Sequence, residues 1–266
     1  MTVRPVLGTS ALADVEALLA RVWRHPPGSV ELDVSLLAAL GRTGNYVAGA
    51  YRNGTLVGAT AGFRCEPFPT TLYSHVTGVD PSTAAAGTGT ALKYHQRVWC
   101  LERHITGVRW TFDPLQARNA RLNVHRLAAR PIHYHRDYYG QLRDGLNRQF
   151  GSDRLLVHWD LEAPEAGGTA TAAPDPAAAV LSVGPSGEPV LSSTTPNRHC
   201  RVAIPRDIDI LRAKDPHVAR QWRDAVRMVL GDLMAEGWEI IDFADSSYVL
   251  RPPDVEPDRQ AQPCTS

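Results

Sequence analysis

The chain has 266 residues, of which 43% are hydrophobic and 21% charged, and its 28 basic and 28 acidic side chains give a formal net charge of zero. These values predict a soluble globular protein with one domain, or with one domain and a smaller second one. The neutral balance argues against a nucleic-acid partner, and no apolar run approaches the ~20 residues of a membrane-spanning helix. The four cysteines form no C-x-x-C pair, so we expect reduced thiols in a cytoplasmic protein, without structural zinc or a disulfide framework.

The first 64 residues combine helical and strand patterns. Apolar residues at helical spacing predict an amphipathic helix over 11–23 capped by Ser10, and a shorter helix over 34–40 capped by Asp33. Residues that favour β-structure predict three strands, over 3–6, 45–51 and 55–64. The turn between the last two strands contains Asn53-Gly54, the strongest short signal for a β-hairpin.

The most informative stretch runs from Leu72 to Glu102. A strand over 72–79 is followed by a loop of small residues, Ala84-Ala85-Ala86-Gly87-Thr88-Gly89-Thr90, and then by a helix over 88–104. A bare backbone at the start of a helix exposes N–H groups, and the helix dipole adds positive potential there. The loop therefore predicts either a site for a phosphate or pyrophosphate, or a simple glycine-rich turn that caps the helix.

Known glycine-loop patterns narrow the first of these interpretations. The loop lacks the Gly-Lys-Ser/Thr of a Walker A motif, and Leu92 stands where a dinucleotide-binding fingerprint needs Gly or Ala. A third pattern, Q/R-x-x-G-x-G/A, is that of an acyl-CoA loop. It fits except at its first position, which is Ala84.

The remaining chain divides into a second run of elements, a biased segment and a small C-terminal piece. We expect a helix over 115–127 and strands over 107–112, 132–139 and 155–161. Residues 163–197 are rich in Ala, Pro and Gly and predict a linker or loop, and residues 253–266 predict a disordered tail. Residues 198–252 predict a β-α-α-β-β subdomain, too small for an independent core, that docks on the first domain or forms a homodimer.

The element order up to residue 162, β-α-α-β-β-β-α-β-α-β-β, resembles the GNAT superfamily of CoA-dependent acyltransferases. Three further stretches resemble a bacterial subgroup of predicted GNAT acetyltransferases with a C-terminal extension: WTFDPLQARNARLN from Trp110, YHRDYYG from Tyr134 and DRLLV from Asp153. The resemblance implies an α+β protein whose residues 1–162 form an acyl-CoA-binding GNAT domain. Its central sheet would be mixed, mostly antiparallel and flanked by helices.

The same resemblance implies how acetyl-CoA or another acyl-CoA would be bound. The pyrophosphate would take the backbone N–H groups of Ala86, Gly87, Thr88, Gly89, Thr90 and Ala91, and the pantetheine would pair along Thr77, Gly78 and Val79. Asn119 matches an asparagine that bonds the cofactor, although it could equally cap a helix. Many members protonate the leaving thiolate with a tyrosine whose position here is Val124, so Asn123, His125 or Tyr138 would have to replace it.

Three residues are candidates for catalysis. His75 has an ordinary pKa near ~6.5, suited to a general base, although it could also be a hydrogen-bonded core histidine. Alternation along the strand predicts Tyr73, His75 and Thr77 on one face and Ser74 and Val76 on the other. Asp113 could position a substrate amine or cap the next helix, and the hydroxyl of Tyr138 could reach the acyl group. His133 and His135 lack a third ligand at motif spacing, so no metal is expected.

These expectations converge on an acyl-CoA-dependent N-acyltransferase that transfers an acetyl or larger acyl group to the amine of a small-molecule acceptor. Two alternatives remain open at this stage. One is a GNAT-fold protein that binds acyl-CoA without catalysis, and the other is a GNAT-fold protein repurposed for acyl-CoA hydrolysis or decarboxylation. Neither a nucleic acid nor a membrane is expected as a partner.

Overall fold

The computed structural model describes residues 1–26, 28–65, 67–82, 87–140, 150–163, 178–193 and 198–253, together with Pro196. The elements formed by these residues are, in chain order, β1 (Thr2–Pro5), α1 (Thr9–Val22), α2 (Val34–Arg42), β2 (Tyr46–Arg52), β3 (Thr55–Cys65), β4 (Phe68–Val79), α3 (Thr88–Leu101), β5 (Gly107–Phe112), α4 (Ala117–Ala120), the π-helical turn η1 (Arg121–Arg126), β6 (Arg130–His135), β7 (Arg154–Asp160), β8 (Ala178–Val183), β9 (Pro189–Leu191), β10 (Cys200–Ala203), α5 (Ile208–Lys214), α6 (Pro216–Ala235), β11 (Glu239–Ala244) and β12 (Ser247–Arg251).

The first sheet has the strand order β1-β2-β3-β4-β5-β7-β6. Neighbouring strands are antiparallel except β4 and β5, which are parallel. Helices cover both faces of this sheet. Ala59 of β3 packs with Leu18 and Leu19 of α1, whereas the adjacent Gly58 faces Leu92 of α3. The predicted fold class, a mixed and mostly antiparallel sheet flanked by helices, is confirmed.

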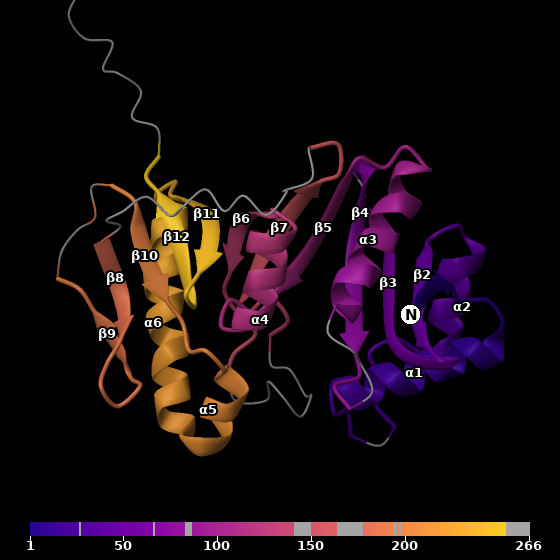
Figure 1. Ribbon diagram of the computed structural model, residues 1–266, viewed down its shortest axis with the longest axis horizontal. Coiled ribbons are helices and arrows are strands. Elements are labelled where there is room, and N and C mark those ends of the chain that lie inside the picture. The colour runs from indigo at the N-terminus through magenta and orange to yellow at the C-terminus, as the bar shows by residue number, and fades with distance from the viewer. Residues whose placement is uncertain are drawn as a thin grey trace, which may run out of the picture.

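Strands β4 and β5 pair over only a short distance. Their ladder has three rungs, the last of which joins Tyr73 to Arg109. Strand β4 then continues to Val79 and β5 to Phe112, and Figure 1 shows the two strands diverging. We call the space that opens beyond Tyr73 and Arg109 the split; it is the main irregularity of the first sheet.

The structure confirms some of the predicted helix caps and turns and contradicts others. The Asp33 side chain accepts a hydrogen bond from the Leu36 N–H, which confirms it as the cap of α2. Asn53 and Gly54 both have positive φ, as the predicted hairpin requires. The cap predicted at Ser10 is wrong, because α1 begins at Thr9 after Gly8. The helix expected over 115–127 is instead the short α4 followed by η1.

The C-terminal part contains more β-structure than the sequence pattern predicted. Strands β8 and β9 lie inside the stretch 163–197 that was expected to be a linker or loop, and this expectation is wrong for 178–191. Because β8 pairs with both β9 and β10, the second sheet has the order β11-β12-β10-β8-β9. Residues 164–177 and 254–266, which belong to the predicted linker and tail, lie outside the described residues.

The second sheet and its helices dock on the first sheet, which was one of the two alternatives. Trp222, Val226 and Leu230 of α6 are fully buried in the same hydrophobic cluster as Leu155 of β7. Figure 1 shows α6 beside the second sheet and α4 beside β6 and β7. No helix in the described part of the chain has the length and apolar composition needed to cross a membrane.

Candidate functional site

The backbone of β4 turns part of its hydrogen-bonding edge toward the split. The Asp80 N–H donates to the Val57 carbonyl of β3 at 3.0 Å. Since residues of an antiparallel strand alternate between the two sides, Gly78 also faces β3, whereas Thr77 and Val79 face away from it. On the side away from β3, the pairing of β4 with β5 ends at Tyr73. The backbone edges of Thr77 and Val79 therefore face the split rather than a neighbouring strand.

Helix α3 begins beside the end of β4 at an N-cap residue that has no side chain of its own. Its N-cap residue is Gly87, which has φ 90°, and a Cβ added there would meet nothing within 4 Å. A left-handed backbone in open space is typical of glycine, and it leaves room for a ligand close to the main chain. Gly89 lies nearer to other groups, because its Cβ would be 3.7 Å from the Leu122 side chain of η1.

One member of the predicted pyrophosphate loop does not stand as expected, and another lies outside the described residues. The Ala91 N–H donates to the Gly87 carbonyl at 2.9 Å, so it is part of the helix and cannot serve a ligand. The expectation for Ala91 is therefore corrected. Ala86 lies outside the described residues, as does Ala84, the position that departs from the acyl-CoA loop pattern.

A β-bulge lies in β4 at the level of the split. Ala61 of β3 pairs with Val76, but Phe63 pairs with Tyr73, so β4 has one more residue than β3 over this interval. The extra residue lies opposite Gly62. Bulges are frequent next to functional sites, because they turn a side chain toward a new direction.

The bulge changes which side chains share a face. Ser74 points toward α3, where its hydroxyl meets Lys93, and Val76 packs in the cluster under α1. Thr77 returns to the α3 side, where its hydroxyl contacts a threonine of β3. The predicted strict alternation, which placed Thr77 on one face with His75, is therefore wrong.

Lys93 of α3 is a site residue that the sequence reasoning missed. Its side chain is 5% exposed, and its Nζ donates to Ser74 Oγ at 3.0 Å and to Gln96 Oε1 at 3.3 Å. The same nitrogen lies 3.8 Å from the ring centroid of Trp110 on β5. Burial lowers the pKa of Lys93 to about 7, against a smaller raising effect of the Cys100 thiol. Among the described residues, no carboxylate forms an ion pair with Lys93.

We call Lys93, Ser74, Gln96 and Trp110 the Lys93 cluster. One buried donor of this cluster has no partner among the described residues. The side chain of Gln96 is fully buried, and its Nε2 makes no hydrogen bond within the described structure. Buried polar atoms are nearly always paired, so an orphan marks a place where a further group can bind.

The face of the first sheet that is opposite α3 carries aromatic and imidazole side chains next to the split. The hydroxyls of Tyr73 and Tyr138 lie 3.4 Å apart, and the ring of His75 lies next to those of Tyr73 and Phe63. The Tyr139 hydroxyl lies 3.3 Å from Thr111 Oγ1 on β5. Burial and the neighbouring Tyr138 hydroxyl raise the pKa of Tyr73, so this phenol stays protonated. His75 and Tyr138, two predicted site residues, are thus on one face.

His75 has an acidic neighbour that the sequence did not reveal. Its Nε2 lies 4.0 Å from Glu31 Oε1, which is ion-pair distance, and the other oxygen of Glu31 lies 3.3 Å from His25 Nε2. Glu31 and His25 come from the loop between α1 and α2, and neither stands in a recognisable motif. Only the packing of this loop against β4 brings the three side chains together.

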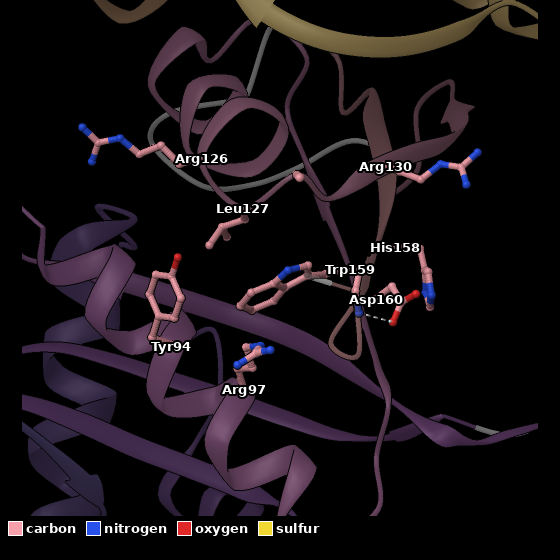
Figure 2. Close-up of a pocket in the computed structure, with 10 residues that line it drawn as sticks. Tyr94, Arg97, Arg126, Leu127, Arg130, His158, Trp159 and Asp160 are labelled. Carbon is pink, nitrogen blue, oxygen red and sulfur yellow. Dashed lines mark hydrogen bonds between the residues drawn. The ribbon is translucent and has the colours of Figure 1, made fainter. Parts of the chain in front are cut away.

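A cavity of about 460 Å³ adjoins the Lys93 cluster on the α3 side (Figure 2). Its central wall is Trp159, which stands edge-on to both Tyr94 of α3 and Trp110 of β5. Arg126 and Arg130 also line the cavity, but Figure 2 shows their guanidinium groups pointing apart. They therefore do not converge on a single anion.

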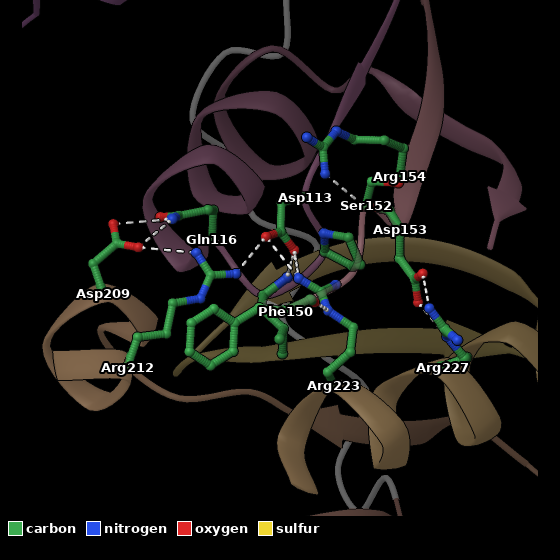
Figure 3. A network of polar contacts seen from close by, with 12 residues as sticks. Asp113, Gln116, Phe150, Ser152, Asp153, Arg154, Asp209, Arg212, Arg223 and Arg227 are labelled. Atoms are coloured by element: carbon green, nitrogen blue, oxygen red, sulfur yellow. Dashed lines mark hydrogen bonds and ion pairs between the residues drawn. The ribbon is translucent and has the colours of Figure 1, made fainter. Parts of the chain in front are cut away.

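Asp113 does not belong to the candidate site. It is 7% exposed, and its carboxylate accepts hydrogen bonds from Arg223 and Arg212 of the C-terminal part (Figure 3). Burial alone would raise its pKa, but the guanidinium groups of Arg223 and Arg212 hold that pKa well below its usual range. Because Asp113 is enclosed and both of its carboxylate oxygens are engaged by arginines, it is not accessible to a substrate amine, and this expectation is corrected. One oxygen does accept the Leu115 N–H, as a cap would.

The remaining candidates differ in accessibility. Asn119 is exposed within α4, whose N-cap is Gln116, so Asn119 is not a helix cap. Val124 is buried in the main hydrophobic cluster and His125 is bound to Asp242 of β11 at 3.0 Å. Within the described ranges, no group of three His, Cys, Asp or Glu side chains could hold a metal ion.

No protein-family model matches the sequence, and no curated protein matches it significantly. Solved structures that resemble the chain include an N-acetyltransferase from Staphylococcus aureus, at 14% identity and TM-score 0.49, covering 60% of this chain and 98% of that one. A ribosomal-protein-alanine N-acetyltransferase from Brucella melitensis has 17% identity, TM-score 0.49 and coverages of 60% and 99%. The diaminobutyrate acetyltransferase of Paenibacillus lautus, solved with its substrate and coenzyme A, has 16% identity, TM-score 0.46 and coverages of 60% and 96%. At identities below 25% and TM-scores below 0.5, this similarity does not establish a function for the chain.

Proposed function

We propose that this chain is an acyl-CoA-dependent N-acyltransferase that transfers an acetyl or larger acyl group to the amine of a small-molecule acceptor. The observation that carries the proposal is the split between β4 and β5. It presents the backbone edges of Thr77 and Val79 next to the N-terminus of α3, whose N-cap residue is Gly87. Strand-like amide groups and a phosphate-binding helix end are the two features that a pantetheine arm and a pyrophosphate require.

The residues present fit an acyl-CoA. Gly87, Thr88, Gly89 and Thr90 would hold the pyrophosphate, and Thr77 and Val79 would pair with the pantetheine amides. Asn119 is exposed on the next helix and free of a capping role. The orphan Nε2 of Gln96 supplies a buried donor at the start of the split. Once bound, acyl-CoA would supply an activated acyl thioester.

The face opposite α3 suits the acceptor amine. His75 takes a proton from the ammonium form of the acceptor, and the Glu31 carboxylate lies 4.0 Å from its Nε2. The hydroxyls of Tyr73 and Tyr138 line the same face and can hydrogen-bond the acceptor. The protein thus separates the two reactants on opposite faces of one sheet and lets them meet through the split.

Acyl-CoA binding without catalysis is the second candidate function, and one observation favours it. Val124 stands where related enzymes are expected to carry a tyrosine acid, and it is apolar and buried in the core. A side chain of this kind cannot protonate a thiolate. The two candidates differ in whether any other group supplies the proton.

Two measurements on the intact chain test these functions. Isothermal titration with acetyl-CoA and longer acyl-CoAs should show saturable binding, and absence of binding to every one would refute both. Release of free thiol is then followed with and without a panel of small amines. Release that depends on an amine supports transfer, release without an amine identifies hydrolysis, and binding without release identifies the non-catalytic protein.

A further inference from the structure

Lys93 is chemically unusual within this chain. Of the 28 basic residues only two are lysines, and the other, Lys214, is exposed on α5. An arginine keeps its proton in essentially every protein environment, whereas a lysine amine releases it when buried. The buried basic group of α3 is thus one that can give up its proton.

The position of Lys93 is set by three elements that meet where the split begins. Ser74 lies at the bulge of β4, directly after the last residue of the β4–β5 ladder, and Trp110 directly follows Arg109, the last residue of β5 that is paired with β4. Lys93 reaches from α3 to both, at 3.0 Å from the Ser74 hydroxyl and 3.8 Å from the Trp110 ring centroid. Its amine is therefore at the closed end of the split, on the side of α3.

The surroundings hold the Lys93 proton weakly. Ser74 and Gln96 offer uncharged oxygen acceptors, and Trp110 offers an aromatic face, but none of these contacts is a carboxylate. The titratable group of α3 that acts on the pKa of Lys93 is the Cys100 thiol, whose own pKa is raised by burial to about 12 and which is therefore neutral. The groups that face Lys93 from β4 and β5, a hydroxyl and an indole, do not titrate near neutral pH. A burial-lowered pKa of about 7 matches the operating range of a general acid.

We propose that Lys93 is the general acid of the acyl transfer, in the role for which Val124 is chemically unfit. The inference rests on the proposed transferase function. As the acceptor nitrogen forms its bond to the acyl carbon, the C–S bond breaks and its electron pair goes to sulfur. The sulfur takes a proton from the Lys93 ammonium group, which leaves free CoA thiol and a neutral amine. Water restores the proton on Lys93, and the proton lost by the acceptor nitrogen leaves through His75.

The first test is independent of turnover. Lysine labelled with ¹³C at Cε gives two signals in this chain, and a Lys93→Arg variant assigns them. In a pH titration of the free protein we expect the Lys93 signal to titrate near neutral pH, well below the ~10.4 of an unperturbed lysine. Adding CoA should shift the Lys93 signal and leave that of Lys214 in place. An ordinary titration of Lys93, or a Lys93 signal indifferent to bound CoA, would overturn the proposal.

The second test compares variants of Lys93 by their kcat. It distinguishes a role in proton donation from a role of the positive charge or of folding. Lys93→Met should lower kcat by about 100-fold with little change in the Kd for acyl-CoA, because an acid contributes about that factor or more. Wild-type kcat should fall above neutral pH as Lys93 deprotonates, and this limb should vanish in Lys93→Met. Lys93→Arg keeps the charge and should be equally slow, and Lys214→Met is the matched control with full activity.

The outcomes also separate this inference from the proposed function. If the wild type binds acyl-CoA and transfers acyl groups while Lys93→Met keeps full kcat and the same pH profile, Lys93 is not the acid and the transferase assignment stands. If the wild type binds no acyl-CoA, the proposed function fails first. Stable acylation of Lys93 by acetyl-CoA, detected by mass spectrometry, would also overturn the proposal, because an amide nitrogen cannot donate the proton. Should Lys93→Met not fold, the labelled wild type still decides.

Discussion

The carboxylate of Asp113 accepts two hydrogen bonds from a single nitrogen, Nη2 of Arg223, at 2.9 and 2.8 Å. The two residues lie on opposite sides of the boundary between the first sheet and α6. Arg212 adds a third contact from α5 at 3.0 Å. The charge cluster therefore ties the C-terminal part to the end of β5, the strand that forms one side of the split.

Asp113→Asn should reduce the free energy of unfolding by about 3–5 kcal/mol, because it removes the counter-charge of the buried Arg223 and one of the two carboxylate partners of the buried Arg212. Urea denaturation followed by circular dichroism measures the change. Asp232→Asn is the control, since the ion pair of Asp232 with Arg136 is more than half exposed and should contribute less than about 1 kcal/mol. Equal stability of Asp113→Asn and wild type would show that the cluster does not hold the two parts together.

The same cluster predicts how stability depends on pH. The pKa of Asp113 is lower in the folded state than its unfolded value of about 3.9, so its contribution is fully present above that value. It is lost as the pH falls toward the folded pKa. We expect the free energy of unfolding of the wild type to decline below about pH 4, and that of Asp113→Asn to decline less steeply. Parallel pH curves for the two proteins would contradict this prediction.

His75→Ala should lower kcat by about 100-fold and leave the Kd for acyl-CoA nearly unchanged, because the imidazole serves the acceptor rather than the cofactor. Steady-state kinetics and calorimetry measure the two quantities separately. His133→Ala, which removes an exposed imidazole from β6, is the control and should keep its activity. If the loss persists undiminished at high pH, where the acceptor amine is neutral without a base, His75 does not act as the base.

Gly87→Glu should abolish acyl-CoA binding, since it places a negative charge at the start of α3 and forces a side chain into the left-handed conformation. The matched control is Gly44→Glu, at a glycine with φ 78° that likewise has nothing within 4 Å and lies after α2. Both variants carry the same backbone strain, so only the charge at α3 separates their affinities. Unchanged affinity in Gly87→Glu would identify the loop as a simple helix cap.

Gly78→Ala should destabilise the protein by about 1–3 kcal/mol through overpacking. A Cβ at this position would lie 2.7 Å from the Trp23 ring and 2.8 Å from Leu19, both of which pack beneath β4. Gly41→Ala is the control in α2, where a Cβ meets nothing within 4 Å and alanine favours the helix. Thermal denaturation should give a lower Tm for the first variant and an equal or higher Tm for the second.

Much of the chain could be predicted from local signals. The apolar periodicity of α1 and α6, the Asp33 cap, the Asn53-Gly54 hairpin and the glycine after β4 each act within a few residues, and each stands where the sequence placed it. These signals depend on propensity and backbone conformation, which neighbouring residues decide. Their order along the chain resembles that of the GNAT superfamily, and this resemblance implied the fold class of the first sheet.

The candidate site depended instead on contacts between distant segments. The bulge in β4 arises from its pairing with β3, and no residue of β4 predicts it. The sequence did not show that Asp113 is enclosed, because Arg212 and Arg223 follow it by 99 and 110 residues. The sequence pattern did not predict β8 and β9, because both strands are short and only the parallel pairing of β8 with β10 joins them to the second sheet.

Lys93 shows the division most clearly. The sequence by itself determined that a lysine stands one turn inside a helix that follows a glycine loop. Only the tertiary structure decided that this lysine is buried, because α3 packs across the point where β4 and β5 part. Burial is a property of everything that surrounds a side chain, and desolvation of an amine is what brings its pKa near neutrality.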